Sequence, residues 1–451
     1  MAATPEAHAS FADTLAVYLK RRVLIVLFLG FSSGLPLALS GSTLLVWMTE
    51  AKVDLRTIGL FALAGTPYTI KFLWAPLIDA LDVPLLSRRF GRRRGWLLLS
   101  QFLLIGAILF LGTCDPAVSP LTVAIGALLV ATASATQDII IDAFRVESLD
   151  ESEQAAGMAS YVAAYRIGML ISTAGALFLV TGFQGLGLRH QPAWTASYVV
   201  MAALVVIGIV TTLAASEPEK SATAAAEHAG EIASGADPVR RVFIAALGAF
   251  SEFLTRDLAL VVLTFVVLFK FTDALSGAMT APFVIDLGFS RNEYAAIIKG
   301  VGLAATLVGG FAGGFVARAF SLPASLWLGG VLQGLANLAF SWQAVVGLNA
   351  GWLTFAIVAE NFTSAVGTVI FVAYLSALCR NPLHTATQYA LLTALAAFGR
   401  TYLSSGAGFI AAATGWPAFF AICAVSGVPA LLLLAWLQRS GHFDGLPPRS
   451  S

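Results

Sequence analysis

The chain has 451 residues, of which 58% are hydrophobic and only 11% are charged. An ordinary soluble protein carries about 25% charged residues, so this composition excludes that class and indicates a chain that crosses a membrane several times. The formal net charge is +1, so the total charge gives no indication of a nucleic-acid or acidic partner.

Twelve apolar runs are long enough to cross a membrane, since about 20 apolar residues span the hydrocarbon core as a helix. These runs are too long and continuous for barrel strands, which alternate over about ten residues. The first run is also too long for a signal peptide, so no cleavable signal is expected. We therefore predict an all-α membrane protein with twelve transmembrane helices, at approximately 23–49, 57–78, 96–113, 121–143, 156–180, 195–215, 258–281, 292–318, 322–343, 351–378, 385–412 and 415–437.

The positions of Lys and Arg predict that both termini are cytoplasmic. In that orientation seventeen of the 26 basic residues lie on the inner side, four lie on the outer side and five lie inside spans. This excess on one side follows the positive-inside rule.

A polar connection of about forty residues separates the sixth span from the seventh. Its first part, EPEKSATAAAEHAGEIASGAD, is typical of a flexible linker. Its second part, 239–254, repeats apolar residues every three or four positions and predicts an amphipathic helix on the inner membrane surface. The expected organisation is a tail (1–22), a six-helix bundle (23–215), this linker (216–257), a second six-helix bundle (258–437) and a tail (438–451). Secondary transporters built from two such halves place the substrate between them.

Ionisable residues inside the spans are the main functional signal. A charge at bilayer depth costs at least about 2.5–3.5 kcal/mol and normally faces a cavity or a partner. Some could be structural ion pairs or could reach the interface, but their spread over seven helices favours a polar transport path. The set comprises Lys71, Asp138, Asp142, Arg166, Lys270, Asp273, Lys299, Glu360 and Arg400.

The segment SATQDIIIDAFR at 134–145 places three of its charges on one helix face, because Asp138, Asp142 and Arg145 are spaced i, i+4 and i+7. Asp142 could pair with Arg145. Asp138 lies deeper and needs a partner from another helix, for which Arg166 is the nearest candidate in sequence.

Lys270 and Asp273 are spaced i, i+3 and could also pair on one face. Carboxyl groups in such surroundings can gain and lose a proton, so Asp138, Asp273 and Glu360 are the expected proton-coupling residues. The five buried cations outnumber the four buried carboxylates, which favours an anionic substrate without separating carboxylates from phosphates.

Glycine pairs predict close helix contacts in two places. GFSSGLP places Gly30 and Gly34 four residues apart, with a hinge at Pro36 as the alternative interpretation, and GGFAGG at 309–314 repeats the spacing. The three cysteines are scattered and lack metal-ligand spacing, so no metal or cofactor is expected.

The loop from Asp79 to Gly95 contains RRFGRRRG and resembles the cytoplasmic Asp…Gly-Arg-Arg signature of the major facilitator superfamily. Asp79 and Gly91 are twelve residues apart rather than about three, which departs from the usual spacing. The expected gating or structural charge pairs come from this loop and the fourth span, at Asp79, Arg92, Arg93, Asp142 and Arg145.

Ten segments, in the same order and spacing, are similar to the AmpG-like muropeptide permeases: GFSSGLPLALSG, TIGLFALAG, KFLWAPLID, GRRRGW, SATQDIIIDAFR, YRIGML, LFKFTDA, KGVGLAAT, AENFTSAVGT and ATQYALLTALAAFGR. The resemblance implies a proton-motive-force-dependent importer of GlcNAc-anhydroMurNAc peptides in the inner membrane of Gram-negative bacteria. Such uptake feeds peptidoglycan recycling and, in some hosts, β-lactamase induction. The implied partners are this anionic substrate, protons and the lipid bilayer, with a monomer expected and no nucleic acid.

The resemblance also implies roles for individual residues. Asp138, beside Gln137, matches a position where the acid is expected to matter for transport. Groups expected to contact the sugars are Tyr165, Asn361, Gln388 and Tyr389. The full set of expected substrate-binding residues is Gln137, Lys71, Tyr165, Arg166, Lys270, Lys299, Asn361, Gln388, Tyr389 and Arg400.

Two alternatives remain at this point: transport of another bulky anion such as acetyl-coenzyme A, which related members carry, and a polytopic receptor or scaffold. A membrane-embedded enzyme is disfavoured because every histidine lies at a span end, in a loop or in a tail. The sequence also lacks an HExxH motif, a Gly-x-Ser-x-Gly motif with a membrane histidine, and a cysteine cluster.

Overall fold

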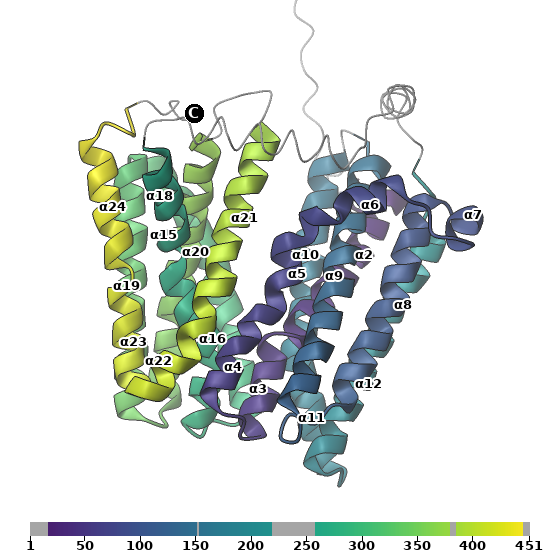
Figure 1. Cartoon of the computed structure of the whole chain (residues 1–451), viewed down its shortest axis with the longest axis horizontal. Coiled ribbons are helices and arrows are strands. Elements are labelled where there is room, and N and C mark those ends of the chain that lie inside the picture. Colours follow the sequence, from purple (N-terminus) through teal and green to yellow (C-terminus); the bar gives the residue numbers. More distant parts are fainter. Residues whose placement is uncertain (1–16, 151–152, 219–257, 379–384, 445–451) are drawn as a thin grey trace, which may run out of the picture.

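The computed structural model describes residues 17–150, 153–218, 258–378 and 385–444, and all regular elements in these ranges are helical (Figure 1). The expected amphipathic helix of the linker lies outside the described residues. The helices form two groups that stand side by side, one from the first half of the chain and one from the second (Figure 1).

Within the described residues, the first group contains five helical segments that are long and apolar enough to cross a membrane. The helix α2 packs along α10, and α12 packs along α8. The elements are α2 (Arg21–Leu39), α3 (Ser42–Glu50), α4 (Leu55–Leu60), η1 (Phe61–Gly65), α5 (Thr66–Ile70), η2 (Lys71–Leu73), α6 (Ala75–Ala80), α7 (Leu86–Phe90), α8 (Arg92–Thr113), α9 (Pro120–Ser148), α10 (Gln154–Leu170), η4 (Ile171–Gly175), α11 (Ala176–Gly185) and α12 (His190–Ala214).

In the second group, α20 packs against both α18 and α19, and α19 also packs against α23. The elements are α15 (Ala259–Phe269), α16 (Phe271–Asp286), α17 (Arg291–Tyr294), η5 (Ala295–Val301), α18 (Gly302–Ala319), α19 (Leu322–Val346), α20 (Ala350–Leu378), α21 (Thr385–Leu403), η6 (Ser404–Gly406), α22 (Ala407–Thr414), α23 (Trp416–Val425) and α24 (Val428–Arg439).

Nine helices in the described ranges are long and apolar enough to cross a membrane. The other three predicted spans differ for physical reasons. The run 57–78 is divided into five short elements and contains Pro67 and Pro76, which interrupt helical hydrogen bonding. The run 322–343 forms the continuous helix α19, whose hydropathy is lowered by polar residues such as Asn337. The run 385–412 is divided at η6.

The glycines of GFSSGLP allow α2 and α10 to approach closely, as predicted from their spacing. A Cβ atom added to Gly34 would lie 2.1 Å from the carbonyl oxygen of Tyr165, and one added to Gly30 would lie 2.6 Å from that of Tyr161. In GGFAGG, a Cβ atom added to Gly309 would meet α20, whereas one added to Gly310 would meet no atom within 4 Å. The packing role is confirmed for the first motif and for one face of the second.

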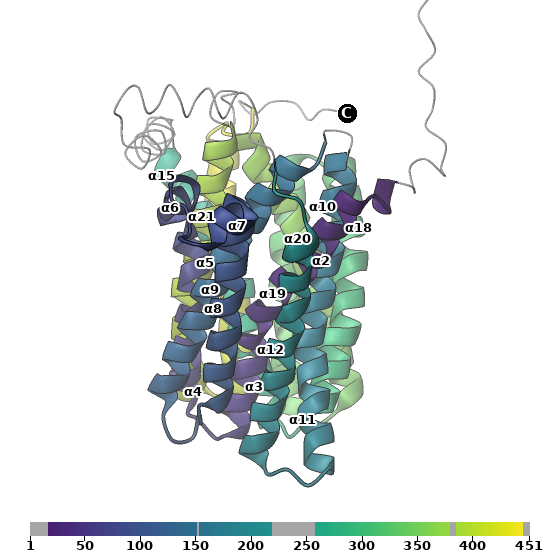
Figure 2. The same cartoon turned by 90° about the vertical axis from the view of Figure 1, so that its right-hand side faces the viewer.

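The two ends of the molecule differ in charge. The helix α2 begins and α24 ends at the same end, where α7 also lies (Figures 1 and 2). We call this end the basic end, because α7 and the first turn of α8 carry Arg88, Arg89 and Arg92, Arg93 and Arg94.

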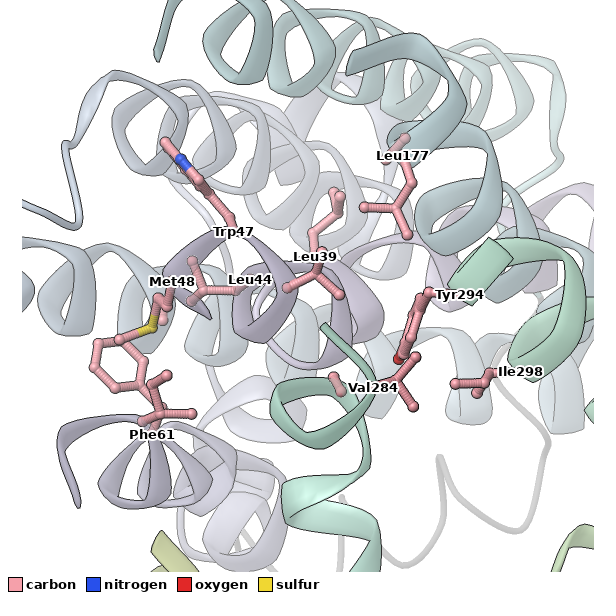
Figure 3. Packing of buried hydrophobic residues seen from close by; sticks show 14 of the residues in the cluster. Leu39, Leu44, Trp47, Met48, Phe61, Leu177, Val284, Tyr294 and Ile298 are labelled. Carbon is pink, nitrogen blue, oxygen red and sulfur yellow. The ribbon is translucent and has the colours of Figure 1, made fainter. Parts of the chain in front are cut away.

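At the opposite end, which we call the far end, the two groups are in direct contact. The helix α4 packs against α22 so tightly that a Cβ on Gly408 would lie 1.9 Å from the carbonyl oxygen of Leu55. One buried apolar cluster takes residues from both groups, including Trp47 from the first and Tyr294 from the second (Figure 3).

At the far end, Asp54 caps the first turn of α4. The side chain of Asp54 accepts a hydrogen bond from the backbone amide of Thr57 at 3.0 Å. Hydrogen bonds from the Thr57 hydroxyl and backbone amide hold the pKa of Asp54 below its ordinary value.

Candidate functional site

A cavity of about 330 Å³ lies between the two groups of helices. Its walls come from α2, α3, α10 and η4 on one side and from α16, α17, η5, α18 and α20 on the other. The charged and amide groups at its surface are Arg166, Lys299, Glu360 and Asn361. Of the predicted substrate-binding residues, the structure therefore brings Arg166, Lys299 and Asn361 to one cavity.

Two π-helical segments, which the sequence did not reveal, form part of this cavity. The segment η4 of the first group touches η5 of the second, and η5 carries Lys299. Such widened turns are rare and occur frequently at functional sites. They place Thr173 and Lys299 on facing walls of the cavity.

Asn361 is oriented by its neighbours on both sides. Its Nδ2 donates to the carbonyl oxygen of Ile357 at 3.0 Å, and its Oδ1 accepts from the hydroxyl of Thr306 at 3.2 Å. Arg166 is exposed toward the cavity, so its guanidinium is accessible to a ligand.

Asp138 lies within the first group and does not line the cavity; only 8% of its surface is exposed. Its Oδ1 accepts a hydrogen bond from the hydroxyl of Ser33, which in turn lies 3.0 Å from the hydroxyl of Tyr161. The cation whose charge acts on it is Lys71 of η2 rather than Arg166. Sequence reasoning missed Ser33 and Tyr161, although the GFSSGLP motif contains the first of them.

Gln137, beside Asp138, is fully buried, and neither its amide nitrogen nor its amide oxygen has a hydrogen-bond partner among the described residues. Lys71 and Tyr165 are half-buried, and Arg400 is exposed. The side chains of Gln388 and Tyr389 lie outside the described part of α21.

The expected Asp142–Arg145 ion pair is not formed. These two side chains, three residues apart on α9, influence each other only through their charges, and Nε of Arg145 is buried without a partner in the described chain. The spacing places both residues on one face of α9, but the described structure has no ion pair between their side chains.

At the basic end, Arg93 pairs instead with Glu147, with its Nε 2.9 Å from Oε2 and its Nη2 2.5 Å from Oε1. The backbone amides of Arg93 and Arg94 both donate to the carboxylate of Glu217, at 2.8 and 3.1 Å. Glu147 and Glu217 were missed because they lie beyond the predicted spans. The side chain of Asp79 is outside the described structure.

In the second group, Lys270 forms an ion pair with Asp273, as the i, i+3 spacing suggested. Asp273 also accepts from the hydroxyl of Ser364 at 2.9 Å, and Lys270 donates to Thr368 at 3.0 Å. Lys270 therefore has two partners within the second group, Asp273 and Thr368. Glu360, which does line the cavity, lies within the charge field of Lys270, Lys299 and Asp273.

A second charged cluster closes the far end between the two groups. Glu50 of α3 receives two hydrogen bonds from Arg291 of α17, at 2.8 Å from Nε and 3.0 Å from Nη2. His190 and Trp194 of α12 also contact the carboxylate of Glu50, at 3.1 and 3.3 Å. Arg291 additionally donates to Gln184 at 2.8 Å. Sequence reasoning missed this cluster because Glu50 and Arg291 are 241 residues apart at span ends.

Comparison with known proteins supports the membrane-transporter architecture. The family model described as Major Facilitator Superfamily matches residues 26–402. The anhydromuropeptide permease of Escherichia coli K12 is 38% identical over 422 residues, which cover 93% of this chain and 80% of that protein. The putative transporter AmpG 4 of Rickettsia felis is 35% identical and covers 93% of this chain and 97% of its own length.

Solved structures agree in fold at much lower identity. A crystal structure of a POT family transporter with 5-aminolevulinic acid has a TM-score of 0.68 and 12% identity, covering 93% of this chain and 96% of the other. The nucleoside transporter NupG has a TM-score of 0.67 and 13% identity, covering 92% and 99%.

The relatives in sequence are permeases and transporters rather than enzymes, and their match extends over both groups of helices. The apolar helices and the family match identify this chain as a multi-pass protein of the bacterial inner membrane. On its sequence identity and its fold together, the chain belongs to the major facilitator superfamily and, within it, to the AmpG-like permeases.

Proposed function

We propose that this protein is a proton-coupled secondary transporter that imports GlcNAc-1,6-anhydroMurNAc peptides across the inner membrane for peptidoglycan recycling. The observation that carries the proposal is the 38% identity to an anhydromuropeptide permease over nearly the whole chain. A cavity between the two helix groups, with cationic and amide groups on its surface, supports it.

The proposal includes twelve membrane crossings in two six-helix bundles, residues 23–215 and 258–437, with both termini in the cytoplasm. In this proposal, the nine apolar helices and the three predicted spans that are interrupted or more polar together give twelve crossings. The arginines of the basic end favour a cytoplasmic position for that end. The far end, where Glu50 pairs with Arg291 across the two bundles, is then the periplasmic end.

Substrate recognition is assigned to the cavity surface. Arg166 and Lys299 come from opposite bundles and can bind the carboxylates of the peptide stem, for which a guanidinium offers two parallel hydrogen bonds. Asn361 and Thr306 can bind the amide and hydroxyl groups of the sugars. Because the two cations belong to different bundles, a bound anion bridges the bundles and couples binding to their relative movement.

Proton coupling is assigned to Asp138 in the first bundle and to Asp273 and Glu360 in the second. All three are carboxyl groups inside the membrane, where a single protonation step changes the charge balance with the neighbouring lysines. The membrane potential contributes about 2.3 kcal/mol of free energy to transport for each charge moved across 100 mV. We expect the protein to act as a monomer in the lipid bilayer.

The test is uptake of labelled anhydromuropeptide into liposomes that contain the purified protein, with and without a protonophore. Asp138→Asn is expected to abolish uptake driven by a pH gradient while the protein remains folded in the membrane. Asp286→Asn is the matched control, because Asp286 is exposed at the far end and an asparagine can still accept from Trp416. Normal accumulation by Asp138→Asn would refute the assignment, and preference for acetyl-coenzyme A would replace the proposed substrate.

A further inference from the structure

Ser33 of α2 contacts the acid to which we assign proton coupling. Its hydroxyl donates a hydrogen bond to Oδ1 of Asp138, and Ser33 is fully buried while Asp138 is 8% exposed. Removal of this hydroxyl would leave that carboxylate oxygen without its donor in a place that water scarcely reaches.

The same hydroxyl also contacts a third polar group, since its oxygen lies 3.0 Å from the hydroxyl oxygen of Tyr161 on α10. A serine hydroxyl has one hydrogen and two acceptor sites. When Ser33 donates to Asp138, it can therefore only accept from Tyr161. The three groups form a directed chain that runs from Tyr161 through Ser33 to the carboxylate.

The backbone around Ser33 is built to bring these groups together. Gly30 and Gly34 lie on either side of it, and both face α10 at distances that leave no room for a Cβ atom. Any side chain at these two positions would push α2 away from α10 and would separate Ser33 from Tyr161. The motif therefore fixes a hydrogen-bond geometry in addition to close packing.

Other groups act on Asp138 mainly through their charges. The helix α9 itself presents Asp142, and η2 presents Lys71. The helices α5 and α10 present Tyr68 and Tyr165, whose hydroxyls lie in the field of Asp138. The element η1 has no ionisable residue, and Arg93 of α8 is engaged with Glu147 at the basic end. Among the described residues, Ser33 is the direct hydrogen-bond donor to the carboxylate of Asp138.

We propose that Ser33 and Tyr161 are positioning residues that set the pH at which Asp138 binds its proton. With Asp138 ionised, the chain donates toward the carboxylate and stabilises its charge. With Asp138 protonated, the acid donates its own hydrogen to Ser33, and the hydrogen of Ser33 turns to the oxygen of Tyr161. Only hydroxyl hydrogens rotate, and no other group gains or loses a proton. The inference deepens the proposed function, because it concerns the proton-coupling acid.

The experiment measures the protonation of Asp138 directly, without transport. The full-length protein in lipid vesicles is titrated by infrared spectroscopy, and the carbonyl band of the protonated Asp138 is identified by its absence in Asp138→Asn. Ser33→Ala is expected to move the midpoint of this band upward by about one pH unit, because it removes a hydrogen bond to the charged form. Ser33→Cys, with its weaker donor, should give a smaller upward shift.

Tyr161→Phe keeps the ring contacts and removes only the hydroxyl, so it tests the chain even if a change at Ser33 disturbs folding. We expect an upward shift smaller than that of Ser33→Ala, since the donor to Asp138 remains but loses its own partner. Ser32→Ala is the matched control: Ser32 is equally buried, faces Gly208 of α12 and has no hydrogen-bond partner in the described structure. Its midpoint should equal that of the wild type.

Unchanged midpoints in Ser33→Ala and Tyr161→Phe would overturn the inference. It would also be overturned if Ser32→Ala shifted the midpoint as much as Ser33→Ala, or if the wild type never showed the carbonyl band of protonated Asp138. Proton-driven uptake of labelled anhydromuropeptide is measured on the same preparations, and its pH profile should shift in the same direction. If the wild type shows no such uptake but the infrared midpoints move as expected, the proposed function fails and the positioning role stands.

Discussion

Replacement of Arg291 by alanine is expected to open the far end of the protein. The guanidinium of Arg291 makes two hydrogen bonds to Glu50 across the interface between the two helix groups and one more to Gln184. The side chains of Arg291 and Glu50 are only 13% and 14% exposed, so bulk water screens this pair weakly. The pair joins the groups while the far end is closed, and separation of the groups must break it.

The size of the effect follows from this geometry. Truncation of one partner of a buried, hydrogen-bonded charge pair costs about 2–5 kcal/mol. The lower figure applies here, because Glu50 keeps His190 and Trp194 as neighbours after the substitution. A loss of about 2 kcal/mol changes the ratio of closed to open far ends by about thirtyfold, since about 1.4 kcal/mol corresponds to a factor of ten.

The assay is a distance measurement between spin labels at positions 52 and 348, in a background without the native cysteines. Lys52 and Leu348 are exposed near the far end, one in each group. Arg291→Ala should move the distribution toward longer distances. Arg189→Ala is the matched control, because Arg189 is exposed at the same end and has no ion pair in the described chain. An unchanged distribution in Arg291→Ala, or the same change in both variants, would contradict the reasoning.

Three further predictions follow from single contacts. Gly408→Ala should prevent closure of the far end and abolish transport, although the protein reaches the membrane in normal amounts. Gly406→Ala should transport normally, because a Cβ atom at that position meets no atom within 4 Å. Uptake and the amount of protein in the membrane are measured together. Lys299→Gln should weaken uptake of a muropeptide about tenfold relative to its amidated analogue, since it removes a charge-assisted hydrogen bond. Lys270→Gln should reduce uptake of both cargoes alike. Equal losses of the two cargoes in Lys299→Gln would show that Lys299 is structural. Asp54→Ala should destabilise the start of α4 by about 1 kcal/mol at neutral pH. Because the pKa of Asp54 is lowered in the folded protein, its contribution is lost as the pH falls through that value, so thermal unfolding of wild type and variant should converge in acid.

Local sequence patterns predicted two contacts correctly, one between residues at i, i+3 spacing and one in which the backbone itself is the partner. The Lys270–Asp273 pair follows from its i, i+3 spacing, and the close approach of α2 and α10 follows from Gly30 and Gly34. Spacing was insufficient for Asp142 and Arg145, because residues on one face still choose among side-chain rotamers.

Contacts between helices could not be predicted in this way. The expected partner of Asp138 was Arg166, but Arg166 lines the cavity. Asp138 instead accepts a hydrogen bond from Ser33 of another helix, 105 residues earlier in the chain. The far-end pair of Glu50 and Arg291 joins residues 241 positions apart. No single-sequence periodicity relates such positions, because the relative rotation and depth of two helices depend on all the residues that pack between them.

The sequence by itself determined that the chain is a membrane protein, that its apolar runs form long helices with charged groups inside them, and which family it resembles. These properties depend on composition, run length and local spacing, and the cost of exposing a charge or a backbone amide to lipid enforces them. Only the tertiary structure decided that Arg166 and Lys299 line one cavity and that Asp138 accepts a hydrogen bond from Ser33. Those outcomes depend on the way the helices are rotated and staggered against one another, which is settled by packing across the whole molecule.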